Sequence, residues 1–295
     1  MERLGTMNDE TLYREYDRAA LDAQYDNRAA VPEHVEHHEG WTRDCAAVRS
    51  AYAGRLDVAY GASAAETLDL FPATGGPAPV QVFFHGGYWL SRDKSDFSFL
   101  APAFVDAGAA MVVVNYALIP AVGMEELVRQ CRLSMAWVHG NAASFGGDAR
   151  RIFVSGHSAG GHLVTMMMAT DWPAFAGLPR DLVKGGCAIS GVFDLEPVRL
   201  CYLNDTLGLT PAQVADNSPV RLPPTSDAPL ILAVGGDESD EFRRQSADLD
   251  AAWRERGASV QVITRPGLNH FTILGDFADR ESPLTRAVLA QMGLA

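Results

Sequence analysis

The sequence predicts an α/β fold, in which helices flank a mostly parallel central sheet. Short apolar runs alternate along the chain with segments of helical periodicity, and this alternation is typical of βαβ units. Two of the runs, residues 79–84 and 110–115, are almost wholly apolar and predict strands buried on both faces. Four more runs predict strands at residues 151–155, 186–190, 230–234 and 260–263.

Two strands of a different kind come first. Residues 56–60 and 67–71 alternate polar and apolar side chains, which indicates strands with one exposed face that pair antiparallel before the parallel set begins. Residues 195–228 are irregular and rich in Pro and Leu, so they form either a cap insertion or an ordinary surface connection. Apolar residues at helical spacing predict helices at residues 97–107, 125–139 and 240–256.

The region before the sheet has helical periodicity. Between residues 8 and 52 apolar side chains recur at helical spacing, Pro32 interrupts the pattern, and a second helix is expected from Trp41 to Tyr52. We therefore expect an N-terminal helical segment over residues 1–55 and an α/β domain over residues 56–295, together forming a single domain.

The composition excludes several classes of protein. The chain of 295 residues has a formal net charge of -13, which argues against binding to a nucleic-acid backbone. The first ten residues are charged and polar rather than a secretory signal, and no run approaches the roughly 20 apolar residues of a membrane span. Four widely spaced cysteines without a C-x-x-C pair argue against a disulfide scaffold or a zinc site. We expect a cytoplasmic protein without nucleic-acid or membrane partners.

A G-x-S-x-G motif at residues 156–160 is the strongest indication of chemistry. It stands between the predicted strand at 151–155 and a helical run at 161–169. Strand, motif and helix in this order are typical of a nucleophile elbow, in which small neighbours let a sharp turn close and expose the serine hydroxyl. The helix that follows directs its amide N–H groups toward the reaction site. Ser158 is therefore the predicted nucleophile.

Two consecutive glycines come shortly after the predicted strand at residues 79–84. Glycines at such a place form an ordinary turn, or they bring backbone amides close to a ligand. Amides held where negative charge develops on an attacked carbonyl form an oxyanion hole. We predict this role for the amides of Gly86, Gly87 and Ala159, the last of which directly follows the serine.

A serine hydroxyl needs a base that takes its proton. In folds with this elbow the chain order is serine, acid and then histidine. Of the eight histidines, only His270 lies beyond the late predicted strands, in a loop after residues 260–263. His270 is therefore the predicted general base.

The acid is expected in the loop after residues 230–234. A glycine, two residues and then the acid is the usual spacing, which favours Glu238, three residues after Gly235. Asp237 is the alternative, because Asp is the commoner acid. Asp240 and Glu241 are expected to cap the following helix. The acid would hold the imidazole in the correct tautomer and stabilise the imidazolium.

With these residues in place, the chain resembles the hormone-sensitive-lipase-type branch of the α/β-hydrolases. Within it, the chain is similar to the kynurenine formamidase (arylformamidase) group and related bacterial esterases. Residues 85–89 match that group's H-G-G-x-W, and residues 156–160 match its serine motif. Residues 238–246 resemble its acid motif, D-S-x-x-F with a trailing R-Q-S, except that Glu238 stands where the group usually has Asp. Residues 269–271 resemble its H-F segment.

The resemblance implies an α/β-hydrolase fold and a serine hydrolase that forms an acyl-enzyme on Ser158. It implies no metal or organic cofactor, an N-terminal segment that partly covers the active site, and a small-molecule ester or aryl amide or formamide as substrate. The aromatic side chains expected to contact the substrate are Tyr88 and Trp89, and further candidates for the pocket wall are Trp41, Phe193 and Tyr202.

Several alternatives stay open at this point. The protein is either a general hydrolase of small esters and formamides or a specific N-formylkynurenine formamidase. A peptidase or C–C bond hydrolase has the same triad, and only the resemblance disfavours it. A non-catalytic binding protein of the same fold is the alternative from another class. Whether the chain forms a homodimer is also left open.

Overall fold

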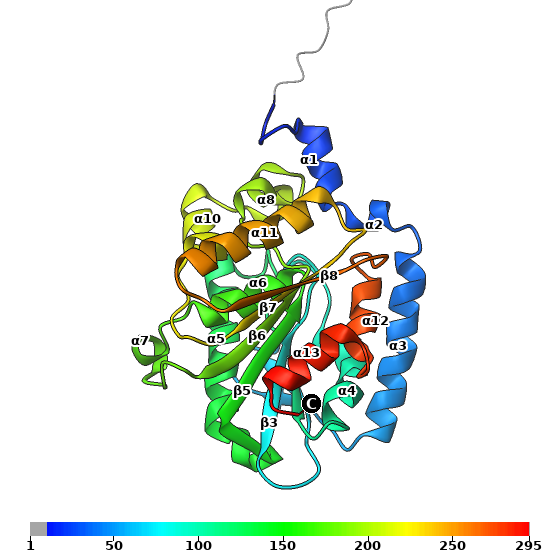
Figure 1. Ribbon diagram of the computed structural model, residues 1–295, viewed down its shortest axis with the longest axis vertical. Coiled ribbons are helices and arrows are strands. Elements are labelled where there is room, and N and C mark those ends of the chain that lie inside the picture. The colour runs from blue at the N-terminus through cyan, green and yellow to red at the C-terminus, as the bar shows by residue number, and fades with distance from the viewer. Residues whose placement is uncertain (1–10, 295) are drawn as a thin grey trace, which may run out of the picture.

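The computed structural model of the protein describes residues 11–294, and within them the chain forms an eight-stranded sheet with helices on both faces (Figure 1). In chain order the strands are β1 (Arg55–Ala59), β2 (Thr67–Phe71), β3 (Ala78–Phe84), β4 (Ala110–Val114), β5 (Gly147–His157), β6 (Val183–Ile189), β7 (Leu230–Gly235) and β8 (Val260–Arg265).

The strand order across the sheet is β1-β2-β4-β3-β5-β6-β7-β8. β2 pairs antiparallel with both β1 and β4, and all other neighbouring strands pair parallel. Every residue of β3 and β4 is buried, as expected of central strands covered on both faces. The predicted fold class, an α/β fold with a mostly parallel central sheet flanked by helices, is confirmed.

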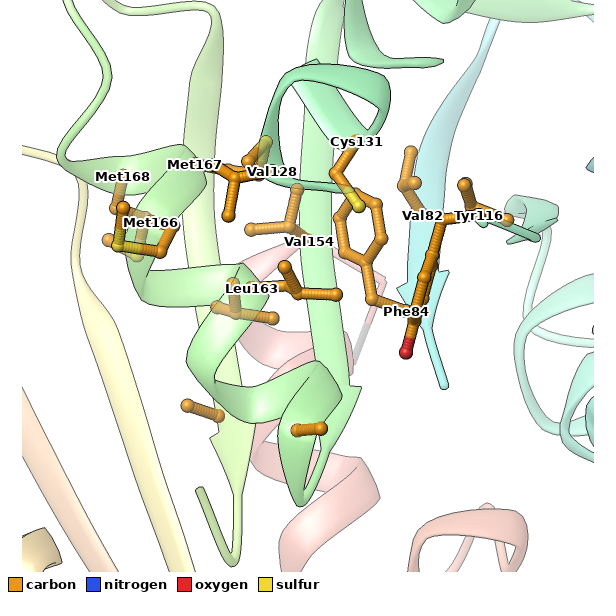
Figure 2. Packing of buried hydrophobic residues seen from close by; sticks show 14 of the residues in the cluster. Val82, Phe84, Tyr116, Val128, Cys131, Val154, Leu163, Met166, Met167 and Met168 are labelled. Atoms are coloured by element: carbon orange, nitrogen blue, oxygen red, sulfur yellow. The ribbon is translucent and has the colours of Figure 1, made fainter. Parts of the chain in front are cut away.

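One face of the sheet is covered by α5 (Met124–Asn141), α6 (Ala159–Met168) and α11 (Asp240–Glu255). All residues of α6 are buried, because this helix packs against β5, β6 and α5. Figure 2 shows Leu163 and Met167 of α6 in one cluster with Val128 of α5, Val154 of β5 and Phe84 of β3. This packing holds the start of α6 rigidly against the ends of β3 and β5.

The other face is covered by α3 (His34–Ala51), the 3-10 helix η1 (Lys94–Leu100), α4 (Ala101–Val105), α12 (Thr272–Ala278) and α13 (Pro283–Gln291). A buried ion cluster anchors α3 there. Arg49 Nη2 donates to the fully buried Asp69 of β2 at 2.7 Å, and Lys94 Nζ lies 3.1 Å from the other carboxylate oxygen.

Short helices complete the chain. Figure 1 shows α1, α2 and α8 at the same end of the molecule. The short helices are α1 (Arg18–Tyr25), α2 (Asn27–Ala30), η2 (Ala142–Phe145), α7 (Trp172–Ala176), α8 (Glu196–Leu200), α9 (Asn204–Leu207), α10 (Pro211–Asn217) and η3 (Pro219–Arg221). Four of them, α8 to α10 and η3, occupy the stretch 195–228 that the sequence shows as irregular.

The predicted boundaries of the N-terminal helices are wrong. Instead of one helix up to Pro32 and another from Trp41, the chain forms α1, α2 and α3. The side chain of Asp17 accepts from the amide of Ala20, and that of Asp26 accepts from the amide of Ala29, so each aspartate starts a new helix. Residues 8–10 of the predicted first helix lie outside the described residues.

Candidate active site

Ser158 lies in the sharp turn between β5 and α6. Its φ of 58° and ψ of -121° form a conformation that costs on the order of 1–3 kcal/mol for a residue with a side chain. The Ser158 amide donates to the Ile189 carbonyl at 2.8 Å, which fastens the turn to the end of β6. Close packing explains the flanking glycines. A Cβ on Gly156 would collide with the carbonyl of Gly160, and one on Gly160 would collide with the carbonyl of Phe84.

The glycine loop, residues 85–92, lies directly beside Ser158. A Cβ on Gly86 would lie 3.0 Å from the Cβ of Ser158, so only a glycine brings this backbone so close. Gly87 has a φ of 109°, and a Cβ there would collide with the carbonyl of Ser91. Within residues 11–294 the structure gives no acceptor for the amides of Gly86, Gly87 or Ala159. These three amides are therefore available to an oxygen atom near Ser158.

His270 and Glu238 form a buried pair. His270 Nδ1 lies 2.7 Å from Glu238 Oε2, and the two side chains are 7% and 1% exposed. Nδ1 faces the carboxylate, so Nε2 is the ring nitrogen that this pair does not use, and both Ser158 and His270 line the same cavity. The structure thus brings the three predicted catalytic residues to one site, from the ends of β5, β7 and β8.

The second carboxylate oxygen of Glu238 is held by two donors. The Ser190 hydroxyl donates to Oε1 at 2.5 Å, and the amide of Gly235 donates to the same oxygen at 2.7 Å. The side chain therefore folds back onto its own loop, which accommodates a residue longer than Asp. Asp237 has an exposed side chain, so the geometry favours Glu238 over Asp237 as the partner of the histidine.

Two side chains pack against His270 and fix its position. The ring of His157 lies 4.5 Å from the imidazole of His270, and the ring of Phe242 lies 4.7 Å from it. His157 Nε2 donates to the His270 carbonyl at 2.8 Å. Burial, together with the neighbouring His270, holds the pKa of His157 well below its ordinary value. His157 is therefore neutral near pH 7 and acts as a donor to the loop that carries His270.

The cavity in front of Ser158 has a volume of about 320 Å³. Its wall comes from the N-terminal segment, the glycine loop, the region after α8 and the loop of His270. Aromatic side chains form much of this wall, namely Tyr25, Trp41, Tyr88, Phe97, Tyr202 and Phe271. The predicted pocket residues Tyr88, Trp41 and Tyr202 therefore face the cavity.

Trp89 and Phe193 do not line the cavity, which contradicts the predicted contact of Trp89 with a substrate. Trp89 is fully buried, and its ring packs edge-on against His162 of α6 with 5.0 Å between ring centroids. Phe193 lies in the same hydrophobic core and is 1% exposed. Both rings belong to the hydrophobic cluster that also contains α6, and burying their apolar surface there stabilises the fold.

Charged side chains also line the cavity. Asp26, Arg28 and Arg92 all contribute to its lining. Arg92 Nη2 lies 2.6 Å from a ring nitrogen of His38. Partial burial and the positive charge of Arg92 lower the pKa of His38 to about 4, so His38 is neutral near pH 7 and accepts from the guanidinium.

Several residues at or beside the candidate site were not singled out by the sequence. Ser190 carries no motif, and only its place after β6 would point to it. Tyr25 and Asn27 lie in the N-terminal segment, for which the resemblance implies only a general covering role. Phe271 follows the base and packs against His38 at 5.4 Å.

Within residues 11–294, no group of three or more His, Cys, Asp or Glu side chains lies close enough together to hold a metal ion. No helix in this part of the chain has both the length and the apolar character needed to cross a membrane.

Comparison with known proteins gives a consistent result. A family model described as BD-FAE matches residues 68–176. The kynurenine formamidase of Salmo salar is 31% identical over 306 residues, covering 99% of both chains. That of Danio rerio is 32% identical over 252 residues, covering 83% of this chain and 84% of its own.

A crystal structure supports the same relationship. A candidate thioesterase from Silicibacter sp. TM1040 is 30% identical with a TM-score of 0.79, covering 90% of this chain and 97% of its own. The matched length extends over nearly the whole chain and so spans the segments that carry the elbow, the glycine loop and the pair of Glu238 and His270. The protein is thus a hydrolase of ester or amide type and belongs to the kynurenine formamidase family of α/β-hydrolases.

Proposed function

We propose that the protein hydrolyses a small carboxylic ester or an aryl amide or formamide through an acyl-enzyme on Ser158. The observation that carries this proposal is the convergence of three groups on one cavity. Ser158 stands in the strained elbow turn, His270 is hydrogen-bonded to the buried Glu238, and unpaired amides of the glycine loop lie beside the serine. This set supplies a nucleophile, a base with its orienting acid, and donors for an oxyanion.

In the first half of the proposed reaction, the Ser158 hydroxyl attacks the substrate carbonyl while His270 Nε2 takes its proton. The amides of Gly86, Gly87 and Ala159 donate to the negative oxygen of the tetrahedral intermediate. A donor of this kind is worth about 3 kcal/mol in the transition state. His270 then gives its proton to the leaving alcohol or amine, and the acyl group stays on Ser158.

In the second half, water attacks the acyl-enzyme. His270 takes a proton from the water, the same amides hold the oxyanion, and the acid leaves as Ser158 recovers its proton. Glu238 holds the imidazole of His270 in place and stabilises the imidazolium that forms twice in each turnover.

The cavity favours a small acyl group and an aromatic leaving group. Its volume of about 320 Å³ is at the low end for a small-molecule site. The aromatic faces of Trp41, Tyr88 and Tyr202 match a planar ring. We also propose that the N-terminal segment and residues 195–228 act as a partial lid and a cap, since both contribute side chains to this wall.

A specific N-formylkynurenine formamidase is the second candidate. The relatives from Salmo salar and Danio rerio bear the name kynurenine formamidase. The charges of Asp26, Arg28 and Arg92 at the cavity favour this candidate, because they match the ammonium and carboxylate groups of an amino acid.

A substrate panel tests both candidates. The values of kcat/KM are compared for N-formylkynurenine, nitrophenyl acetate and nitrophenyl octanoate, with Ser158→Ala as the control. We expect turnover of the first two substrates, poor turnover of the octanoate, and none with Ser158→Ala. If the wild type cleaves the acetate but not N-formylkynurenine, the specific formamidase is excluded. If Ser158→Ala retains the activity, the proposed mechanism is wrong.

Arg28→Gln separates the two candidates further. A specific formamidase should lose about 10-fold in kcat/KM for N-formylkynurenine and little for nitrophenyl acetate, since the acetate has no carboxylate to bind.

A further inference from the structure

The glycine loop adopts an unusual backbone conformation. Four of its residues have positive φ, with values of 109° at Gly87, 51° at Tyr88, 60° at Trp89 and 80° at Arg92. Only one of these four is a glycine, so the other three hold a conformation that is unfavourable for residues with a Cβ. Such a segment persists only where its surroundings fix it. The positions of the predicted oxyanion donors therefore depend on the contacts that hold the glycine loop in this conformation.

Tyr88 fastens the glycine loop to the N-terminal segment. Its hydroxyl donates to the backbone carbonyl of Tyr25 at 2.8 Å and accepts from Asn27 Nδ2 at 3.0 Å. The single proton of the hydroxyl is therefore used within the protein. Burial raises the pKa of Tyr88 well above its ordinary value, so the donor is retained at all pH values of interest.

Tyr25 is in turn fastened to α11. It is fully buried, and its hydroxyl donates to Glu241 Oε2 at 2.9 Å and accepts from Gln245 Nε2 at 2.7 Å. The same Gln245 accepts through Oε1 from the amide of Phe193, just beyond β6. α11 begins two residues after Glu238.

The ring of Tyr25 is also linked to His270 through one intervening ring. It packs against Phe242 of α11 with 6.0 Å between centroids, and Phe242 packs against His270. Tyr25 of the N-terminal segment thus contacts two parts of the site. Its backbone carbonyl binds Tyr88 of the glycine loop, and its hydroxyl binds α11, the helix that follows Glu238.

We propose that Tyr25 and Tyr88 are a pair of positioning residues that couple the oxyanion donors of the glycine loop to the helix behind the catalytic acid. The inference rests on the proposed acyl-enzyme mechanism. It assigns the Tyr88 hydroxyl a positioning role, in addition to the contact of the Tyr88 ring with the cavity, and it gives the N-terminal segment a part in positioning the site as well as covering it.

Tyr88→Phe is the direct test, because it keeps the ring and removes the hydrogen bond to Tyr25. We expect kcat to fall about 10-fold with KM changed less than twofold. Binding of a boronic acid, which forms a tetrahedral adduct with the serine, should weaken by a similar factor, while binding of the acid product should not change. Tyr52→Phe is the control, since the Tyr52 hydroxyl donates to the exposed Asp106 outside the cavity.

Three results would overturn the proposal. A raised KM with unchanged kcat would show that the Tyr88 hydroxyl acts in substrate binding only, and unchanged values of both would remove any role for it. A fall in kcat that parallels a lower melting temperature in Tyr88→Phe would indicate a structural role only.

A double-mutant cycle adds a test of the coupling between the pair. Tyr25→Phe should also lower kcat, and the double variant should lose less than the product of the two single losses, because both act on one chain of bonds. Independent, multiplicative losses would contradict the coupling. Labelling of wild-type Ser158 by a fluorophosphonate separates this outcome from failure of the proposed function, since a wild type that is not labelled would overturn both.

Discussion

The two carboxylate oxygens of Glu238 have different hydrogen-bond partners. Oε2 faces His270, while Oε1 is held by Ser190 and the amide of Gly235. Each oxygen has a separate function, so the side chain cannot rotate without losing one set of bonds. A catalytic carboxylate held in this way orients the imidazole in a single tautomer.

The assignment of Glu238 rather than Asp237 leads to a first prediction. Glu238→Ala should lower kcat by about 10³- to 10⁴-fold, the effect typical of losing the triad acid. Asp237→Ala should keep kcat within about twofold, because its side chain is exposed and takes no part in the pair. Steady-state kinetics of both variants check this, and the reverse order of effects would transfer the role to Asp237.

A second prediction concerns Ser190, whose φ is 50°. Ser190→Ala and Ser190→Gly both remove the hydroxyl donor to Glu238, so both should lower kcat by about 10-fold, equivalent to about 1.4 kcal/mol. Ser190→Gly should be the more stable of the two in urea unfolding, since glycine adopts positive φ without strain. Full activity in either variant would show that the hydroxyl does not position the acid.

Sequence patterns could identify some of these residues and not others. Ser158 and His270 lie in short motifs whose place along the chain is set by the strands before them. Ser190 is 48 residues from Glu238, and Tyr25 is 216 residues from Glu241. No local pattern marks such distant partners, because their pairing depends on how the sheet and α1 pack.

At the scale of elements, the approach of α6 to the end of β3 determines where Ser158 stands. The contact is backbone to backbone, with Gly160 against the Phe84 carbonyl. Because backbone atoms form this contact, no side-chain rotation can make room for a larger residue at position 160. The elbow is therefore held by the same packing that fills the core around α6.

A third prediction compares two glycines in helices. Gly160→Ala should destabilise the protein by about 3 kcal/mol or more and remove activity, because its Cβ would overlap the Phe84 carbonyl. Gly140→Ala should stabilise it by about 0.5–1 kcal/mol, since this residue of α5 has no neighbouring atom within 4 Å of an added Cβ. Urea unfolding of both variants measures the difference, and equal stabilities would contradict the proposed tight contact.

The strands were predictable and the N-terminal helices were not. Apolar runs such as 79–84 define a buried strand by themselves, and β3 is found at Ala78–Phe84. The breaks at Asp17 and Asp26 arise because an aspartate side chain competes for the first amides of a helix. Helical periodicity continues across such a break and therefore hides it.

At the scale of the whole molecule, several histidines are buried without charge. Burial lowers the pKa of His162 to about 4, and it also lowers the pKa values of His85 and His157. An unfolded chain binds protons at these groups from about pH 6.5 downward. Their contribution to stability is therefore fully present above pH 6.5 and is lost as the pH falls toward 4.

The fourth prediction follows from this loss of stability as the pH falls. The free energy of unfolding should fall between pH 6.5 and about 4, with about 3 kcal/mol of the fall due to His162. His162→Gln should show a fall smaller by about that amount, while His139→Gln, at the partly exposed end of α5, should behave like the wild type. Urea titrations at several pH values test this, and a fall of equal size in His162→Gln would contradict it.

The sequence predicted the fold class but not which segments meet at the cavity. The fold class follows from the alternation of strands and helices. The cavity in front of Ser158, in contrast, is lined by residues far from it in sequence, such as Arg28, Tyr202 and Phe271. The division into residues 1–55 and 56–295 remains a prediction.

We propose that Ser158 carries the acyl group of the substrate between the two halves of the reaction. Rapid acid quenching during turnover of nitrophenyl acetate, followed by peptide mass spectrometry, detects such an intermediate. We expect one acetyl group on the peptide that contains Ser158, and none with Ser158→Ala. Acetyl on another residue, or sustained turnover by Ser158→Ala, would contradict it.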